Sequence, residues 1–309
     1  MENILVTGGG GFIGSHLCDF LLEKGNSVIC IDNFGSGSSK NIEHLKGNEK
    51  FSLIEHDISE NLKLDQKIDK IYHLASRASP IAFKKYPIDI MMTNSLGTFN
   101  LLEISRKNNA PILFTSTSEV YGEPEEHPQK ETYNGNVNCN GPRSCYDESK
   151  RFAEALFFSF NRQYGTEIRI VRLFNTYGPR MRSDDGRVIP NFANQALKNE
   201  PITVYGDGSQ TRSFCFVTDT VKGLYKMMES GKSGPINLGN PVERTILETA
   251  KLVKKLTSSD SEIIFKSLPK DDPTRRKPDI TKAKEELDWN PEIDFEEGLE
   301  KTIDYFKQF

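Results

Sequence analysis

ILVTGGGGFIG, residues 4–14, runs from a hydrophobic strand directly into an amphipathic helix. Gly8, Gly11 and Gly14 stand at the spacing that lets a chain turn sharply, bring backbone N–H groups close to a phosphate and pack the new helix against the sheet. The N–H groups at the start of that helix carry a partial positive charge, which attracts an anion. Glycine-rich turns are common, and this run also fits the spacing Gly9, Gly11 and Gly14, so its meaning depends on the residues around it.

The next predicted strand, residues 27–31, ends at Asp32, which stands 18 residues after Gly14. An acidic residue at this place accepts hydrogen bonds from the hydroxyl groups of an adenosine ribose and repels a 2′-phosphate. Residues 33–37 contain no arginine that would compensate for that repulsion. The two features together predict a dinucleotide site that prefers NAD to NADP, rather than an Asp32 that only caps a turn.

The composition is that of a globular chain, because 309 residues with 36% hydrophobic content form one large or two modest domains with ample core. With a net charge of −4 and no basic run beyond residues 275–277, the chain shows no nucleic-acid-binding surface. No segment approaches the roughly 18 apolar residues that span a bilayer, and the first residues form a strand and not a charged leader. We therefore expect a cytoplasmic protein with no membrane partner. Five scattered cysteines and five histidines show neither disulfide nor metal-ligand spacing, so we expect no metal.

Strand and helix patterns alternate through the first half of the chain. Further strands are predicted at residues 51–54, 70–74, 111–115 and 167–172, with helical patterns between most of them. Such alternation predicts an α/β fold, with a doubly wound parallel sheet of the Rossmann type covered by helices on both faces.

The sequence changes character after Asn175, where loops rich in glycine and proline begin. A short strand at residues 201–205 and helices near 247–256 and 295–306 predict a smaller α+β substrate-binding domain. We expect residues 1–174 to form the NAD-binding domain, to which residues 212–240 return. The remainder of residues 175–309 would form mainly a cap over the cofactor.

Two long helices are predicted at residues 89–108 and 146–164, and both carry apolar residues on more than one side. A helix with surplus apolar surface on the outside of such a sheet often packs against a second copy of the chain. We therefore expect a homodimer built on these two helices.

The catalytic pattern is Tyr146 and Lys150, four residues apart on one predicted helix, with the stretch TSTSE at residues 115–119 closing a predicted strand. Residues four apart share a helix face, so the ammonium can lie near the phenol. Together with the positive ring of an oxidised nicotinamide, that ammonium lowers the tyrosine pKa and makes Tyr146 a base for a sugar hydroxyl. Tyr-x-x-x-Lys arises by chance on many helices, and it indicates catalysis here because the NAD loop and the Ser/Thr cluster accompany it.

Several stretches resemble the extended short-chain dehydrogenases/reductases that act on nucleotide sugars, and more narrowly the UDP-glucuronic acid decarboxylases. The resemblance spans essentially the whole chain, and Glu119 is its more specific marker. The stretches that carry it are STSEVYG at 116–122, GPRSCYDE at 141–148, FNTYGPRM at 174–181, DGRV at 185–188, TVYGDGSQTRSF at 203–214, DDP at 271–273 and PDI at 278–280.

The resemblance implies a set of residues for each part of the site. The implied catalytic residues are Thr117, Ser118, Glu119, Tyr146, Lys150 and Arg212. The implied NAD-binding residues are Gly8, Gly11, Phe12, Ile13, Gly14, Asp32, Asn33, Asp57, Ile58, Leu74, Ser76, Thr93, Tyr146 and Lys150. The implied substrate-binding residues are Glu119, Asn175, Arg187, Tyr205, Gln210 and Arg212.

The mechanism implied by the resemblance begins when Tyr146 deprotonates the C4 hydroxyl and NAD accepts the C4 hydride. The resulting ketone stands β to the C6 carboxylate, so carbon dioxide leaves readily. Thr117 would hydrogen-bond the C4 oxygen, while Glu119 and Arg212 would orient the sugar and manage the proton that returns to C5. The hydride then returns and UDP-xylose leaves, so NAD acts as a tightly held catalyst.

Two positions depart from the decarboxylase pattern. Met92 stands where these enzymes usually have a lysine that receives the sugar carboxylate, and Arg77 stands where a proline is common. Either Arg77 binds the carboxylate instead, or the substrate has none. The alternatives are therefore a C4 dehydrogenase, 4-epimerase or 4,6-dehydratase acting on another nucleotide sugar, such as a hexose or heptose, and a non-catalytic NAD-sensing regulator.

Overall fold

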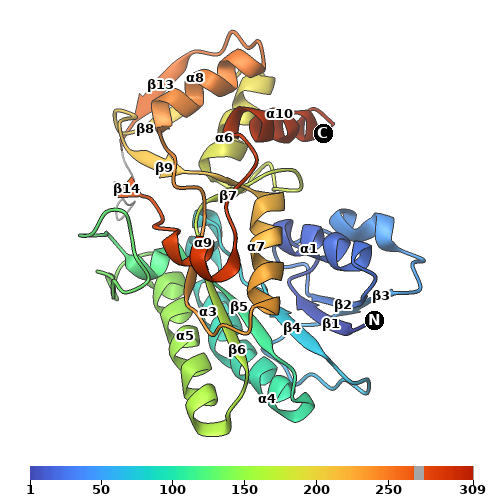
Figure 1. Ribbon diagram of the computed structural model, residues 1–309. Coiled ribbons are helices and arrows are strands. Elements are labelled where there is room, and N and C mark those ends of the chain that lie inside the picture. The colour runs from blue at the N-terminus through green and yellow to red at the C-terminus, as the bar shows by residue number, and fades with distance from the viewer. Residues whose placement is uncertain (268–274, 309) are drawn as a thin grey trace.

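A seven-stranded parallel sheet forms the centre of the computed structural model, in the order β11-β6-β5-β4-β1-β2-β3 (Figure 1). Its strands are β1 (Asn3–Thr7), β2 (Ser27–Asp32), β3 (Phe51–Glu55), β4 (Lys70–His73), β5 (Ile112–Thr117), β6 (Ile168–Leu173) and β11 (Ile236–Leu238). The order extends from β1 in both directions, which confirms the predicted doubly wound α/β fold. The structure describes residues 1–267 and 275–308, so the DDP stretch at 271–273 lies outside it.

Helices cover both faces of this sheet. They are α1 (Phe12–Glu23) and α7 (Val217–Glu229) on one face, and α4 (Thr98–Asn108) and α5 (Ser144–Tyr164) on the other. Val6 packs in one hydrophobic cluster with Leu17 of α1, whereas its neighbour Leu5 packs in another with Phe157 of α5. Adjacent strand residues point to opposite faces, so a strand buried on both sides is apolar throughout.

The helix predicted at 89–108 is one helical run in three parts, α3 (Pro87–Met92), a π-helical turn η2 (Thr93–Gly97) and α4. It begins two residues early because Pro87 suits the first position of a helix, where its missing N–H is not needed. In the π turn, Asn94 Nδ2 donates to Ser149 Oγ of α5 at 2.9 Å. The sequence pattern did not predict this turn, nor the short helix α2 (Pro80–Lys85) before it.

The C-terminal half forms a smaller α+β layer beyond the carboxyl ends of the sheet strands (Figure 1). It contains α6 (Val188–Leu197), β8 (Ile202–Tyr205), β9 (Thr211–Ser213), β12 (Glu243–Thr245), α8 (Ile246–Leu256), β13 (Ile263–Lys266), β14 (Arg275–Arg276) and α10 (Phe295–Phe306). The remaining elements are η1 (Ser39–Leu45), η3 (Ser118–Tyr121), β7 (Thr176–Tyr177), β10 (Cys215–Phe216) and α9 (Thr281–Leu287). Between β10 and β12 the chain returns to the central sheet, where α7 packs on one face and β11 pairs with β6.

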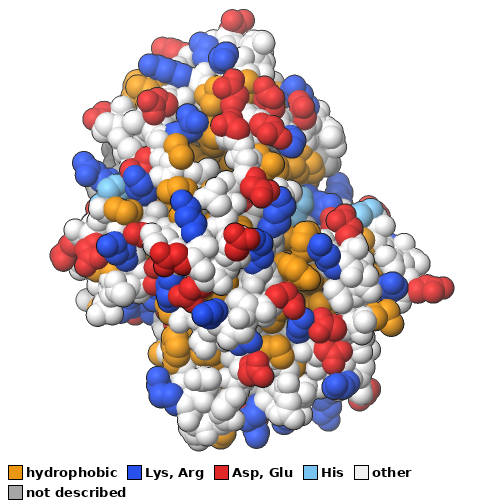
Figure 2. Space-filling model, viewed as in Figure 1, with side chains coloured by type: hydrophobic (Ala, Val, Ile, Leu, Met, Phe, Trp, Pro, Cys, Tyr) orange, Lys and Arg blue, Asp and Glu red, His pale blue; other side chains and the backbone are white. Residues whose placement is uncertain are grey.

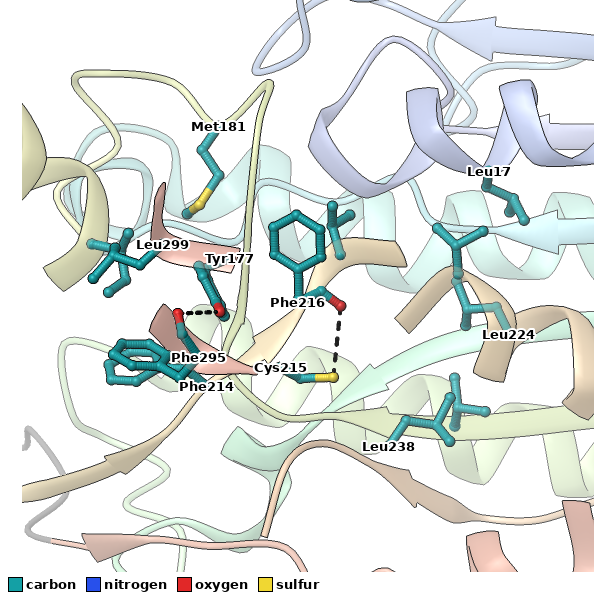
Figure 3. Close-up of a cluster of buried hydrophobic side chains, with 14 of the residues drawn as sticks. Leu17, Tyr177, Met181, Phe214, Cys215, Phe216, Leu224, Leu238, Phe295 and Leu299 are labelled. Carbon is teal, nitrogen blue, oxygen red and sulfur yellow. Dashed lines mark hydrogen bonds between the residues drawn. The ribbon is translucent and has the colours of Figure 1, made fainter. Parts of the chain in front are cut away.

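One continuous hydrophobic core joins the sheet to this layer (Figure 3). Tyr177 donates its hydroxyl to the carbonyl oxygen of Phe295 at 3.1 Å, and Phe214 stacks on Phe295 with ring centroids 5.4 Å apart. These aromatic residues belong to the same cluster as Leu17 under the sheet. The two layers are therefore packed as one body.

On the outside, Lys, Arg, Asp and Glu side chains are intermingled over the face seen in Figure 2.

Candidate active site

A large cleft opens at the carboxyl ends of β1, β2, β4, β5 and β6, where doubly wound sheets bind their ligands. It brings together nearly all the residues that the sequence and the resemblance indicated. The cleft is lined by Gly8, Gly11, Phe12, Ile13, Gly14, Asp32, Asn33, Asp57, Ile58, Leu74, Ser76, Arg77, Thr93, Thr117, Ser118, Glu119, Tyr146, Lys150, Asn175, Arg187, Tyr205 and Arg212. Gln210 is not among the lining residues, and its Nε2 donates to the carbonyl oxygen of Tyr205 at 2.5 Å.

The glycine-rich loop has the shape that a dinucleotide phosphate requires. Gly8 has a φ of +75°, and a Cβ on it would lie 2.8 Å from the backbone nitrogen of Ala75. A Cβ on Gly14 would lie 2.1 Å from the carbonyl oxygen of Gly8, so the helix packs on the loop only with glycine there. Gly11 precedes α1 and provides no side-chain cap, which leaves the first N–H groups of the helix to a ligand. These residues fit the diphosphate of a dinucleotide.

Asp32 at the end of β2 is fixed by two backbone N–H groups. Its Oδ2 accepts from Gly10 at 2.9 Å and its Oδ1 from Phe34 at 2.8 Å, while burial raises the pKa of the carboxyl group. Beside it, Asn33 Nδ2 donates to Asp57 Oδ2 at 2.7 Å. Polar groups thus gather at the end of this strand, at the place where an adenosine ribose would lie.

Tyr146 and Lys150 lie in the cleft on consecutive turns of α5. Lys150 Nζ donates to the carbonyl oxygen of Thr115 at 2.8 Å and lies 5.8 Å from the Tyr146 ring centroid. Burial lowers the pKa of Lys150 to about 7 and raises the pKa of Tyr146 well above its usual range, although a side-chain hydrogen bond to Thr117 opposes the latter. The predicted lowering of the tyrosine pKa depends on Lys150 together with the positive ring of a bound nicotinamide, so it stays a prediction for the protein with NAD bound.

Glu119 is held by two arginines that the sequence pattern did not single out, Arg143 and Arg276. Its Oε2 accepts from Arg143 Nη2 at 2.6 Å and from Arg276 Nη2 at 3.3 Å. Arg276 is 2% exposed and also donates to the carbonyl oxygen of Ser118 at 3.0 Å. Burial acts to raise the pKa of Glu119, but Arg276, Arg143 and Arg212 together outweigh it and lower that pKa to about 2. The carboxylate is thus ionised at every physiological pH.

Two further residues connect this cluster to the tyrosine. Phe83 of α2 stacks on the Tyr146 ring with centroids 4.9 Å apart, and the Arg143 guanidinium lies 5.4 Å from the Phe83 ring centroid. Asp147, next to Tyr146, is buried beside Glu119, and burial raises its pKa to about 7. Arg143 and Asp147 stand inside the stretch GPRSCYDE, so the resemblance marked their segment but not their roles.

The substrate side of the cleft carries two arginines, Arg187 and Arg212. Arg187 precedes α6 and forms a two-point ion pair with Asp185, with Nη2 and Oδ2 2.8 Å apart. Arg212 of β9 donates from Nη1 to the carbonyl oxygen of Thr211 at 2.9 Å. Met92, where a lysine was expected to meet a sugar carboxylate, is 42% exposed and does not line the cleft.

Neither a metal site nor a membrane span is found in the part of the chain that the structure describes. Its His, Cys, Asp and Glu residues form no group able to hold a metal ion. None of its helices is long and apolar enough to cross a bilayer.

Comparison with known proteins agrees with this geometry. The sequence model of the family described as GDP-mannose 4,6 dehydratase matches residues 5–302. UDP-glucuronic acid decarboxylase 1 of Xenopus tropicalis is 52% identical over 307 residues, which cover 99% of this chain and 72% of that protein. UDP-glucose 4-epimerase of Thermotoga maritima, solved with UDP-glucose, superposes with a TM-score of 0.92 at 34% identity, covering 99% of each chain.

A third relative has been solved with both a nucleotide sugar and the cofactor. UDP-glucuronic acid 4-epimerase of Bacillus cereus, in complex with UDP-glucuronic acid and NAD, superposes with a TM-score of 0.90 at 32% identity over 99% of each chain. The resemblance inferred from the motifs is thus confirmed over the full length. The chain belongs to the family of nucleotide-sugar epimerases and dehydratases, and among its members to the group of enzymes formed by the UDP-glucuronic acid decarboxylases.

Proposed function

We propose that the protein is a UDP-glucuronate decarboxylase that releases carbon dioxide, makes UDP-xylose and uses NAD without net oxidation. The observation that carries this proposal is the identity of 52% over 99% of the chain to an enzyme of that name. The cleft supports it, because Tyr146, Lys150, Thr117 and Glu119 are gathered beside the glycine-rich loop. The relatives are enzymes, which speaks against the alternative of a non-catalytic NAD sensor.

The residues of the chain have separate roles in this reaction. Gly8, Gly11 and Gly14 would bind the diphosphate of NAD, and Asp32 its adenosine ribose. When bound, NAD supplies a hydride acceptor and a positive charge beside C4 of the sugar, and the oxidised sugar is a β-keto acid. Tyr146 would then take the O4 proton and later return it, since that added charge offsets the burial that raises its pKa.

Thr117 and Glu119 would complete the reaction centre. The Thr117 hydroxyl, within hydrogen-bond reach of Tyr146, would bind the same C4 oxygen and stabilise its developing charge. With a pKa of about 2, Glu119 is almost never protonated, so we assign it to orienting the sugar and not to storing the proton for C5. Asn175, Arg187, Tyr205 and Arg212 would contact the nucleotide sugar from the C-terminal layer, which would act as the cap over residues 1–174.

The decisive experiment is mass analysis of the product after incubation with UDP-glucuronate. We expect a nucleotide sugar lighter by one carbon dioxide, with no accumulation of reduced cofactor. Tyr146→Phe protein serves as the control, because it keeps the cleft but lacks the base. A product of unchanged mass would overturn the proposal.

A second candidate function is 4-epimerisation of the same substrate. It is favoured by the likeness to the Bacillus cereus UDP-glucuronic acid 4-epimerase, which shares 32% identity over 99% of both chains. An epimerase inverts C4 and keeps the carboxylate, so the product keeps its mass and differs in chromatographic position. The same incubation therefore distinguishes the two functions.

We also propose that the protein is a homodimer. The helical run from α3 to α4 and the neighbouring α5 expose large apolar side chains, namely Ile88, Met91, Met92, Leu96, Phe99, Phe152 and Tyr164. Such a set on an outer layer is typical of an isologous contact. Light scattering at micromolar concentration should give twice the chain mass, and Phe99→Glu should lower it to the monomer.

A further inference from the structure

We infer that Arg77 belongs to the cofactor half of the cleft, where its guanidinium binds the diphosphate of NAD, and not to the half that receives the sugar. The inference rests on the NAD-binding part of the proposed function. It differs from the role that the missing lysine at position 92 suggested, which was to bind a substrate carboxylate.

The contacts of Arg77 point toward the end of β2. Its Nη1 donates to the carbonyl oxygen of Gly35 at 2.5 Å. A Cβ on Gly35 would lie 2.2 Å from Nη2 and 2.7 Å from Cζ of the same guanidinium, so the arginine packs directly against this glycine. On its other side the guanidinium lies 4.3 Å from the ring centroid of Tyr86. Backbone and ring together hold the charge in one place.

The segment that Arg77 touches lies directly on the phosphate-binding loop. Ser38 donates its backbone N–H to the carbonyl oxygen of Gly10 at 2.9 Å. A Cβ on Gly37 would lie 2.8 Å from the carbonyl carbon of Gly10 and 3.0 Å from the nitrogen of Gly11. Residues 33–38 thus connect the position of Arg77 to the loop that begins α1. Arg77 and Gly11 line the same cleft, so the guanidinium lies on the cofactor side of it.

The guanidinium also has donors that a ligand could use. A guanidinium carries five N–H groups in a fork that fits phosphate oxygens. Among the described residues no carboxylate lies within 4.0 Å of it, and its hydrogen bond to Gly35 uses Nη1 alone. A half-buried cation with uncommitted donors on the wall of a cleft is suited to an anionic ligand.

Of the two phosphate positions on an adenine dinucleotide, the diphosphate fits better than a 2′-phosphate. The Asp32 carboxylate, with which Arg77 interacts favourably, occupies the ribose end and would repel a 2′-phosphate. By contrast, the sugar end of the cleft is marked by Tyr146 and Glu119, neither of which contacts Arg77. The cofactor preference thus stays with NAD although an arginine is present.

The test compares Arg77→Ala and Arg77→Lys with Arg106→Ala, using each protein as purified. Arg106 is a matched control, since its guanidinium also lies over an aromatic ring, that of Tyr164 at 5.2 Å, but on the outer surface. The readouts are the NAD released by acid, the rate at which NAD is lost on dialysis, uptake of added NADP, and the affinity for UDP by calorimetry. None of these depends on which sugar the enzyme converts.

We expect Arg77→Ala to lose NAD at least tenfold faster than the wild type, with the affinity for UDP within threefold. Arg77→Lys should be intermediate, because it keeps the charge and loses the fork, and Arg106→Ala should match the wild type. Normal NAD retention in Arg77→Ala with a raised KM for UDP-glucuronate would overturn the inference in favour of the carboxylate. Uptake of NADP by the wild type that Arg77→Ala abolishes would overturn it in favour of the 2′-phosphate. A wild type that ignores UDP-glucuronate would refute the proposed function and leave these binding results valid.

Discussion

Gly14→Ala should loosen the glycine-rich loop and release NAD. The new Cβ would lie 2.1 Å from the carbonyl oxygen of Gly8, where ordinary contacts begin at 3.4 Å, and within 2.9 Å of two further backbone atoms of Gly8 and Gly9. Gly8 itself is tied to Gly11 by a backbone hydrogen bond of 3.0 Å, so the loop must move as a whole. Overpacking of this kind costs about 1–3 kcal/mol, and backbone neighbours that cannot rotate away favour the upper end.

The higher helix propensity of alanine offsets part of this overpacking cost. Alanine is better than glycine inside a helix by about 1 kcal/mol, so the expected loss is about 2 kcal/mol. For a chain of 309 residues, an unfolding entropy of about 2.1 cal/mol/K per residue makes this a fall in Tm of about 3 °C. Thermal unfolding and the NAD content of acid extracts measure the two consequences.

Gly25→Ala provides the comparison for this variant. Gly25 follows the same helix at a φ of +85°, with no atom within 4 Å of the position of a Cβ. Alanine there costs only the left-handed strain of about 1–2 kcal/mol, and NAD should be retained. A Gly14→Ala protein with wild-type Tm and full NAD content would refute the steric reasoning.

Two further predictions concern the reaction centre. Tyr146→Phe should lower turnover at least about a hundredfold, the scale of general-base removal, while NAD stays bound, and near-normal kcat would remove Tyr146 from the mechanism. Glu119→Gln should destabilise the protein at neutral pH, because folding lowers the pKa of Glu119 from 4.5 to about 2. The carboxylate therefore contributes its full stabilisation above the unfolded pKa, and this stabilisation is lost as the pH falls toward 2. The pKa shift corresponds to about 3 kcal/mol of folding stability. Urea unfolding at pH 7, 5 and 3.5 should show that the variant is less stable than the wild type at pH 7 and that its stability changes less with acid. Equal unfolding curves for the two proteins would contradict this.

Local spacing explains which parts of the site could be predicted from the sequence. The glycine-rich loop, Asp32 and the Tyr146–Lys150 pair each lie within one turn or one strand–helix unit, so their geometry follows from the chain itself. Arg276 meets Glu119 across 157 residues, and no periodicity shows such a contact. Its stretch, residues 275–277, stood out only as a short basic run.

Arg77 is a residue that the sequence did mark, but its contacts could not be predicted from the sequence. The sequence showed that an arginine stands in the loop after β4, and the missing lysine at position 92 suggested a carboxylate as its partner. In the fold that loop crosses toward the end of β2, and Met92 faces outward on the helical run. The direction in which a loop side chain points depends on tertiary packing, which in this case is decided by Gly35 and Tyr86.

The late position of β11 in the chain has a consequence for synthesis on the ribosome. β6 ends at Leu173, but its outer neighbour is completed only at Leu238, and the second arginine that contacts Glu119 comes later still, at position 276. Until then a nascent chain carries a strand with an open edge, the kind of surface that pairs with other chains or with chaperones. Productive folding must therefore await nearly the whole polypeptide, and a truncated product would lack both a closed sheet and an assembled reaction centre.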